Sequence, residues 1–519
     1  MPSFLKKMMM NCDEEVNMTP LTFTAEEAGA TIKFTKTGSP TVEGIQYRIG
    51  TSGGWSPYTI DTVLTLANVG DCVQFQNTLE TLGTDNNNYA SFVITGQIAA
   101  SGNCMSMLNY SDKVSKYAFN RLFDECSSLT SAPELPATTL DYYCYQYIFH
   151  NCTSLTSAPE LPATTLSAGC YGHMFNGCSS LINAPELPAT SLVTYCYSAM
   201  FMYCKSIVNA PELPATTLAN FCYQYMFYGC KSIVNAPELP VKTLAPGCYS
   251  HMWDGCTSLT SAPELPATTL ANYCYQYMFQ GCTSLINAPE LPATTLANYC
   301  YSDMFNGCTS LVNAPELPAT TLAPYCYNAM FNRCTSLVNA PMLHATTMAN
   351  YCYSEMFSSC SSLKNAPELP ATSLAEKCYN YMFFGCSSLT SAPELPATSL
   401  ATNCYNSMFY RCRSLTSAPG LPATTLANFC YSYMFNGCTS LVTAPELPAT
   451  TLAPYCYNAM FNGCTKLNYI KVNFSSWINN TTNNWVAGVS STGVFNAPSD
   501  LPVIVGDSNV PTGWTVTNN

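Results

Sequence analysis

Cysteine is the residue of this chain whose side chain can do the most varied chemistry, and it recurs at a fixed spacing. One series of fourteen runs from Cys126 to Cys464 in steps of 26 residues. A second series of thirteen runs from Cys144 to Cys456 in the same steps, so the two series hold 27 of the 30 cysteines. Thiols at such positions could bind zinc, form disulfides or exchange electrons. Their neighbours in the chain decide among these chemistries.

Metal binding is the least favoured of them. Zinc sites use close pairs such as C-x2-C or nearby histidines, whereas the spacings here are C-x7-C, as in "CYQYMFQGC" at 274–282, and C-x17-C. The four histidines form no continuous column. We therefore expect no metal site and no cofactor.

Disulfides between neighbouring repeats remain an alternative, because repeats stacked as in a sheet bring equivalent Cα atoms to ~5 Å. Side chains in register run parallel, however, and do not converge on one another. We favour a ladder of reduced cysteines that act as small apolar side chains.

The elements that carry these cysteines form an array of thirteen 26-residue units over residues 126–464, without insertion or deletion. Such regularity predicts a solenoid in which each coil stacks on the last. Within a unit, "SLTSA" is β-like and "APELP" predicts an extended edge, because proline cannot donate to a sheet ladder. The segment "ANYCYQYMFQG" predicts one or two turns of helix on the opposite side of the coil.

The two ends of the chain do not repeat. After an N-terminal segment, 1–18, residues 19–105 contain short alternating runs such as "ATIKFTKT" and "DCVQFQ", which predict a small β-sandwich. Residues 106–125 predict a degenerate first coil, the N-terminal cap of the solenoid. Residues 465–519 predict a C-terminal cap made of a helix and strands.

The recurring phrase M-F-x-x-C-x-S-L, as in "MFQGCTSL" and "MFNGCTSL", resembles the BspA-like leucine-rich repeat of bacterial surface proteins, in its methionine-phenylalanine subtype. The resemblance covers about 126–464. It implies a leucine-rich solenoid without enzymatic activity that is used in adhesion. The units are longer and richer in proline than that family leads us to expect.

Composition excludes several partners. Only 9% of residues are charged and the net charge is −13, so neither nucleic acid nor an anionic membrane surface is an expected partner. The sequence contains no apolar run of transmembrane length, which predicts no membrane insertion. The first residues, "MPSFLKKMMMNCDEEVNM", do not read as a secretory signal.

A column of glutamates runs from Glu134 to Glu446 in steps of 26, interrupted by Met342 and Gly420. Carboxylates stacked at ~5 Å repel by roughly 0.8 kcal/mol per neighbour in water. One carboxylate per coil, without other oxygen ligands, is a poor calcium site. We favour a solvated acidic row over cation binding.

Two columns vary most among the repeats, and we call them together the variable face. The first runs from Tyr147 to Ala459 and the second, three residues later, from His150 to Asn462. A spacing of three places both on one side of a helical turn. Aromatic residues gather on or beside these columns in two places, and such side chains with polar neighbours suit sugar or protein binding. The predicted ligand-binding residues are Tyr203, Tyr225, Tyr228, Tyr381, Phe384, Tyr410 and Tyr433.

No arrangement of residues indicates catalysis, so we predict a non-enzymatic binding protein of an extracellular surface or a virion. The first hypothesis is an adhesin that recognises cell-surface glycans or proteins. The alternatives are a bacteriophage tail or head appendage that binds its host, which would need no export signal, and a rigid structural spacer. Residues 1–105 would then support homo-oligomer formation or virion assembly.

Overall fold

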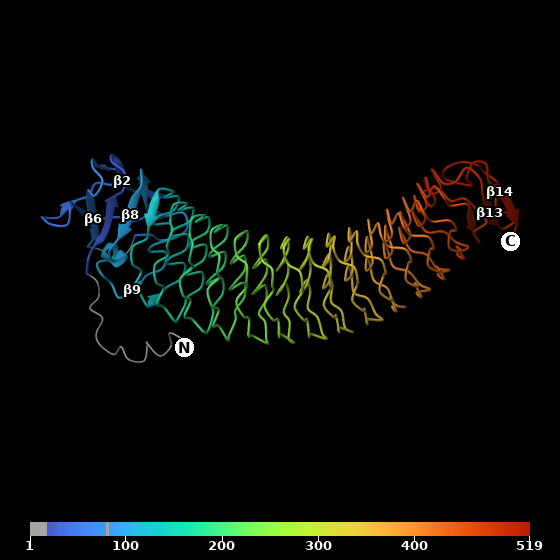
Figure 1. The fold of residues 1–519 in the computed structure, drawn as a ribbon, viewed down its shortest axis with the longest axis horizontal. Coiled ribbons are helices and arrows are strands. Elements are labelled where there is room, and N and C mark those ends of the chain that lie inside the picture. The colour runs from blue at the N-terminus through green and yellow to red at the C-terminus, as the bar shows by residue number, and fades with distance from the viewer. Residues whose placement is uncertain (1–17, 79–81, 519) are drawn as a thin grey trace.

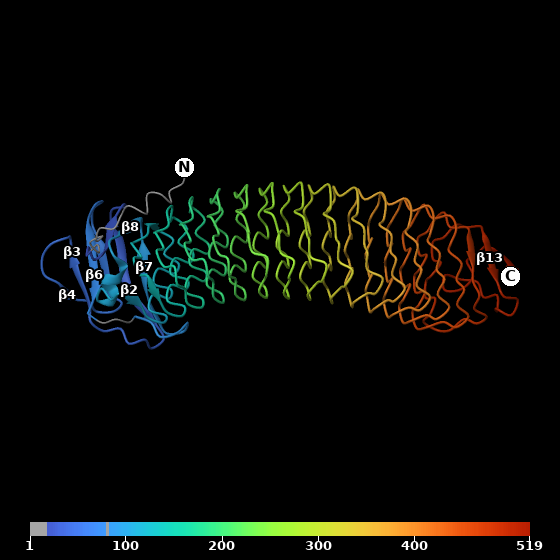
Figure 2. The ribbon, with the colours of Figure 1, turned by 90° about the horizontal axis from the view of Figure 1, so that it is seen from below.

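The computed structural model describes residues 18–78 and 82–518, and the N-terminal segment 1–18 lies outside them apart from Met18. Figure 1 shows a group of strands at one end, a long curved stack of coils, and a second small group of strands at the other end. The view from below in Figure 2 shows the same succession of coils along one axis. Each functional side chain is therefore positioned by its own coil and by the coils next to it.

The region 19–105 forms two β-sheets, and the first coil adds one strand to the larger of them. The larger sheet has the strand order β10-β8-β1-β6-β3-β4 and the smaller has the order β5-β2-β7. Their strands are β1 (Leu21–Ala25), β2 (Ala30–Thr37), β3 (Ile45–Ile49), β4 (Ser56–Pro57), β5 (Val63–Leu66), β6 (Cys72–Asn77), β7 (Tyr89–Thr95), β8 (Ile98–Ser101) and β10 (Leu129–Ser131). The alternation of buried and half-buried residues along β2 is the pattern by which a strand presents one face to a core.

Phe92 on β7 lies at the junction between these sheets and the coils. Its ring centroid lies 4.7 Å from those of Phe23 on β1 and Phe34 on β2, and 5.6 Å from that of Phe123, with which it is stacked. Its carbonyl oxygen accepts a hydrogen bond from the Sγ of Cys126. The sheets and the first coil thus share one hydrophobic core, and the parallel pairing of β10 with β8 extends the larger sheet into the repeats.

The extended side of each coil has very little regular strand. Two coil strands, β10 and β11 (Thr139–Leu140, paired with β9, Lys113–Val114), precede a series of isolated parallel bridges such as Asn183↔Asn209 and Asn209↔Asn235. Prolines in almost every coil explain this, because they supply no N–H to the ladder. The predicted short strand is reduced to single bridging residues in most coils.

The predicted helical turn is wrong. In 273–282 the N–H groups of Gln276, Met278 and Gln280 donate to the carbonyl three residues earlier, and those of Tyr275 and Tyr277 donate to the next coil. The segment is therefore a run of consecutive β-turns whose alternate N–H groups join coil to coil. An α-helix would satisfy these groups internally and leave neighbouring coils without backbone hydrogen bonds. In the described residues the one helical element is the 3₁₀ helix η3 (Cys104–Leu108).

Columns of identical side chains fill the coils. Phe279 and Phe305 stack with centroids 5.6 Å apart, and Tyr275 and Tyr301 stack at 5.8 Å. These four side chains are 0–1% exposed, as are the cysteines of both series. The repeated phrase of the sequence therefore specifies a core in which each residue packs on its own copy in the next coil.

The C-terminal region continues the stack of coils, with fewer residues per coil. The strands β12 (Tyr469–Lys471), β13 (Val494–Ala497) and β14 (Thr515–Asn518) form a parallel sheet. Trp485 is fully buried, and its indole N–H donates to the carbonyl of Asn509 at 2.8 Å. The strands predicted in 465–519 are present, but the predicted helix is absent from the described part of this region, where the Trp485 ring packs against Tyr457 and Phe461 of the last coil instead.

Candidate binding face

The β-turns hold a left-handed residue at every fourth position, for example Tyr273, Tyr277 and Gly281 with φ of 62°, 57° and 66°. The first variable column coincides with the middle one of these positions, and all its members from Tyr147 to Ala459 have φ between 49° and 59°. Its bulky members are half-buried or exposed. Its buried members are Ala199, Asp303, Ala329, Ser407 and Ala459.

The first predicted cluster is assembled as expected, although by β-turns and not by a helix. The ring of Tyr228 lies 5.3 Å from that of Tyr203 and 5.8 Å from that of Tyr225, both edge to face. The ring of Tyr225 stacks on His251 at 4.4 Å, and His251 stacks on Tyr277 at the same distance. The structure therefore places these three tyrosines in one aromatic group that extends into the next coils.

The second predicted cluster also forms one group. Phe384 lies 5.6 Å from Tyr381 and is stacked on Tyr410 at 5.0 Å, and Tyr410 lies 6.4 Å from Tyr433. The guanidinium of Arg411 lies 5.2 Å from the centre of the Tyr410 ring, a cation–π distance. Tyr381 and Tyr433 are 37% and 39% exposed, so apolar ring area faces solvent here.

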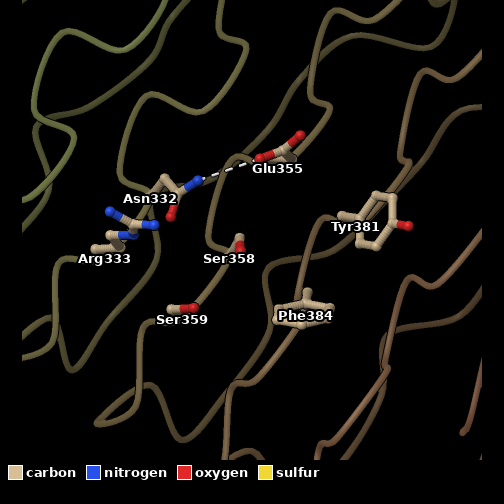
Figure 3. Close-up of a pocket in the computed structure, with 7 residues that line it drawn as sticks. All are labelled: Asn332, Arg333, Glu355, Ser358, Ser359, Tyr381 and Phe384. Atoms are coloured by element: carbon tan, nitrogen blue, oxygen red, sulfur yellow. Dashed lines mark hydrogen bonds between the residues drawn. The ribbon is translucent and has the colours of Figure 1, made fainter.

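A depression of about 270 Å³ adjoins the second cluster, and it spans three successive coils. Figure 3 shows a polar wall on one side, aromatic rings on the other, and serines between them. The amide of Asn332 donates to a carboxylate oxygen of Glu355, in the next coil, at 3.3 Å. The lining residues are Asn332, Arg333, Glu355, Ser358, Ser359, Tyr381 and Phe384. Tyr381 and Phe384 are the predicted residues that the depression contains.

Burial perturbs the carboxylates of the variable face. It raises the pKa of Glu355, an effect that Asp303 reinforces and Arg333 opposes. It also raises the pKa of Asp303, although Asp303 accepts hydrogen bonds from Ser302 at 2.8 Å and Asn306 at 2.9 Å. The donors compensate only in part for the loss of water around this 8% exposed side chain.

These shifts predict a pH-dependent effect of Asp303→Asn. A carboxyl with a raised pKa binds its proton more tightly in the folded state, so wild type loses stability as pH rises from the ordinary value of 3.8 through the raised value. Asparagine does not titrate. The unfolding free energy of the variant, relative to wild type, should therefore increase between about pH 3 and about pH 7. Urea unfolding at both pH values measures this, and a difference that is constant or falls would contradict it.

The thiols have little chemistry available to them. Every cysteine in residues 18–78 and 82–518 is a free thiol, and those of both repeating series are buried. Burial raises the pKa of the Cys274 and Cys386 thiols to about 12. The Sγ of Cys282 donates to the carbonyl of Trp253 at 3.1 Å, and the series from Cys152 to Cys464 makes the equivalent bond, whereas Cys126 donates to Phe92 on β7. A protonated, buried thiol is a poor nucleophile and a poor metal ligand, so these cysteines pack the coils.

The glutamate column is exposed throughout. Glu446, at its C-terminal end, pairs with Lys471 at 2.9 Å. Across the described part of the chain, no three His, Cys, Asp or Glu side chains meet as a metal site would require.

Sequence reasoning missed Arg333 and Ser359, which belong to the third left-handed position of the turn. This position is usually glycine, the residue that adopts positive φ without steric cost. The exceptions among the thirteen units are Asn151, Tyr203, Arg333, Ser359 and Arg411. Four of these five belong to or adjoin the two aromatic groups. A comparison of the repeats for departures from glycine would therefore have found them.

A ladder of tyrosines at the first left-handed position was also missed. Tyr299, Tyr325 and Tyr351 stack at 4.4 Å, and the ammonium group of Lys377 donates to the Tyr351 hydroxyl at 2.7 Å. A left-handed non-glycine residue costs roughly 1–2 kcal/mol, and an aromatic pair contributes about 0.5–1.5 kcal/mol. Because the two terms are similar, stacking explains how bulky residues are tolerated there.

Two comparisons bear on identity. A search among curated proteins finds no match to this chain. The family model for the BspA type leucine rich repeat region matches residues 104–237, 249–390 and 351–490 in six copies. In the described residues, none of the helical segments has the length and hydropathy needed to cross a membrane. The matched residues make up more than half of the sequence, and the chain belongs to the family of BspA-type leucine-rich repeat proteins.

Proposed function

We propose that this protein is a non-enzymatic adhesion protein that recognises a cell-surface glycan or protein through the variable face of its coils. The observation that carries the proposal is the depression between Arg333 and Tyr381, where an exposed and a half-buried aromatic ring converge with polar side chains from three coils. Its family supports this, because BspA-like repeat proteins are typically surface-associated.

The physical character of the face favours binding over catalysis. Tyr381 and Phe384 offer flat apolar area, while Asn332 and Ser359 offer hydrogen-bonding groups around it, the combination that recognition surfaces use. The most numerous potential nucleophiles are the cysteines of the two series. They are buried away from this face, and burial keeps their thiols protonated. A rigid stack of coils also presents such a face with little ordering cost on binding.

A binding screen on native protein tests the proposal. The full chain is applied to an array of cell-surface glycans and to extracted surface proteins, beside the variant Tyr381→Ala/Phe384→Ala. We expect at least tenfold weaker binding by the variant, since aromatic anchors often contribute 2 kcal/mol or more. Tyr142→Ala, at a 53% exposed tyrosine of the first coil, is the control and should bind as wild type does.

Binding that both variants retain, or an absence of any binding by wild type, would contradict the proposal. The second outcome would favour the structural spacer.

A further inference from the structure

The strongest indication of ligand chemistry is Arg333. It occupies the left-handed position where most repeats have glycine, with φ of 61°. The backbone conformation there is disfavoured for any residue with a Cβ, so the side chain is kept at a conformational cost that the glycine repeats avoid. Ser359, at the same position one coil later, repeats the departure with φ of 62°. Two consecutive departures line the same depression.

The Arg333 guanidinium is available to a ligand. Its side chain is exposed, and in the described part of the chain it has no carboxylate partner within ion-pair distance. Glu355, the acidic residue of the depression, instead accepts a hydrogen bond from Asn332. A planar guanidinium with free N–H groups matches a carboxylate through two parallel hydrogen bonds.

The opposite wall and the size of the depression define the rest of the ligand. Tyr381 and Phe384 face Arg333 across the serines, and their rings suit the C–H face of a sugar. Asn332, Glu355 and Ser359 supply donors and acceptors for hydroxyl groups. A volume of about 270 Å³ lies just below that of pockets for drug-sized ligands. One monosaccharide unit is the occupant that fits.

We propose that the depression binds one carboxylate-bearing sugar residue of a larger glycan, with its carboxylate on Arg333 and its ring against Tyr381. This inference rests on the proposed function and specifies the ligand class at the same site. It places the acidic group of the glycan on a basic residue of a chain that has 18 Lys and Arg against 31 Asp and Glu. General attraction between the protein and an anionic glycan therefore does not explain such binding.

The test compares sialyllactose with lactose, which lacks the acidic sugar, on wild type and on Arg333→Gly. Wild type should bind sialyllactose at least tenfold more tightly than lactose, and the variant should lose that preference, because a charge-assisted bidentate contact is removed. Glycine restores the common residue of the column, so the melting temperature of the variant should equal or exceed that of wild type. Loss of binding would then not come from unfolding.

Asn151→Gly is the matched control, since Asn151 occupies the same left-handed position seven coils earlier and lies outside both the depression and the two aromatic groups. It should leave the preference for sialyllactose unchanged. Glucuronic acid and glucose glycosides repeat the comparison with a second acidic sugar. Equal binding of acidic and neutral members of both pairs would overturn this inference while leaving the proposed function in place. An absence of binding to any glycan or surface protein would overturn both.

Discussion

Replacing Phe92 by alanine is expected to lower the free energy of unfolding by about 3–5 kcal/mol, the usual range for a fully buried aromatic side chain. Phe92 is 0% exposed and contacts the rings of Phe23, Phe34 and Phe75 in the two sheets. On its other side it stacks on Phe123 of the first coil. Alanine would leave a cavity where the sheets and the coils meet.

The loss of stability should also be greatest in the first coil. Amides of 119–126 should exchange hydrogen faster in Phe92→Ala, because the first coil loses the ring that covers its end. Ile45→Ala is the control, since Ile45 is buried on β3, far from β10 in the strand order. It should destabilise the sheets without the same local increase in 119–126. Similar exchange in both variants would mean that the sheets do not cap the coils through Phe92.

Phe305→Ala is the second large expected effect, again about 3–5 kcal/mol. Its ring lies between Phe279 and Phe331 at 5.6 Å and 5.7 Å, and all three are fully buried. Because each coil contacts only its neighbours, the loss should open the coils around the substitution more than those at the ends. Urea unfolding measures the total loss, and hydrogen exchange locates it.

Phe384→Ala is the matched control for Phe305→Ala, because it removes the same side chain from the half-buried variable face. It should cost about 1 kcal/mol. The variant loses the stacking of this ring on Tyr410, but removal of a half-buried ring leaves no closed cavity. Equal losses for the two variants would contradict the division of the coil into a packed interior and a free face.

The sequence was sufficient to predict what depends on exact repetition. Columns such as those of Cys282 and Phe305 pack on their own copies, so a fixed period of 26 residues revealed both the stacked coils and the inward position of the cysteines. The aromatic groups around Tyr228 and Phe384 could be predicted for the same reason. Residues in neighbouring repeats lie side by side once the coils stack.

Local backbone geometry could not be predicted in this way. A cysteine, methionine and phenylalanine at i, i+4 and i+5, as in 274–279, fit a helix, but every fourth residue of this segment is left-handed. The N–H groups that a helix would keep join one coil to the next. Tyrosine at position 273 gives no signal of positive φ, because stacking on Tyr299 offsets a preference that an isolated residue would follow. Arg333 was missed because the variable columns were chosen by diversity and not by departure from glycine.

The most direct test of the central claim is to replace the residues in which these repeats differ while the packed interior of the coils is left unchanged. In Arg333→Gly/Ser359→Gly/Phe384→Asn, each residue becomes the commonest one of its column. Binding to the glycan array and to extracted surface proteins is measured beside the melting temperature. We predict a melting temperature close to that of wild type, because the two glycines relieve left-handed strain and offset the loss of the Phe384 ring, and we predict that binding is lost. A variant that is folded and binds as wild type does would show that recognition does not depend on the residues in which these repeats differ.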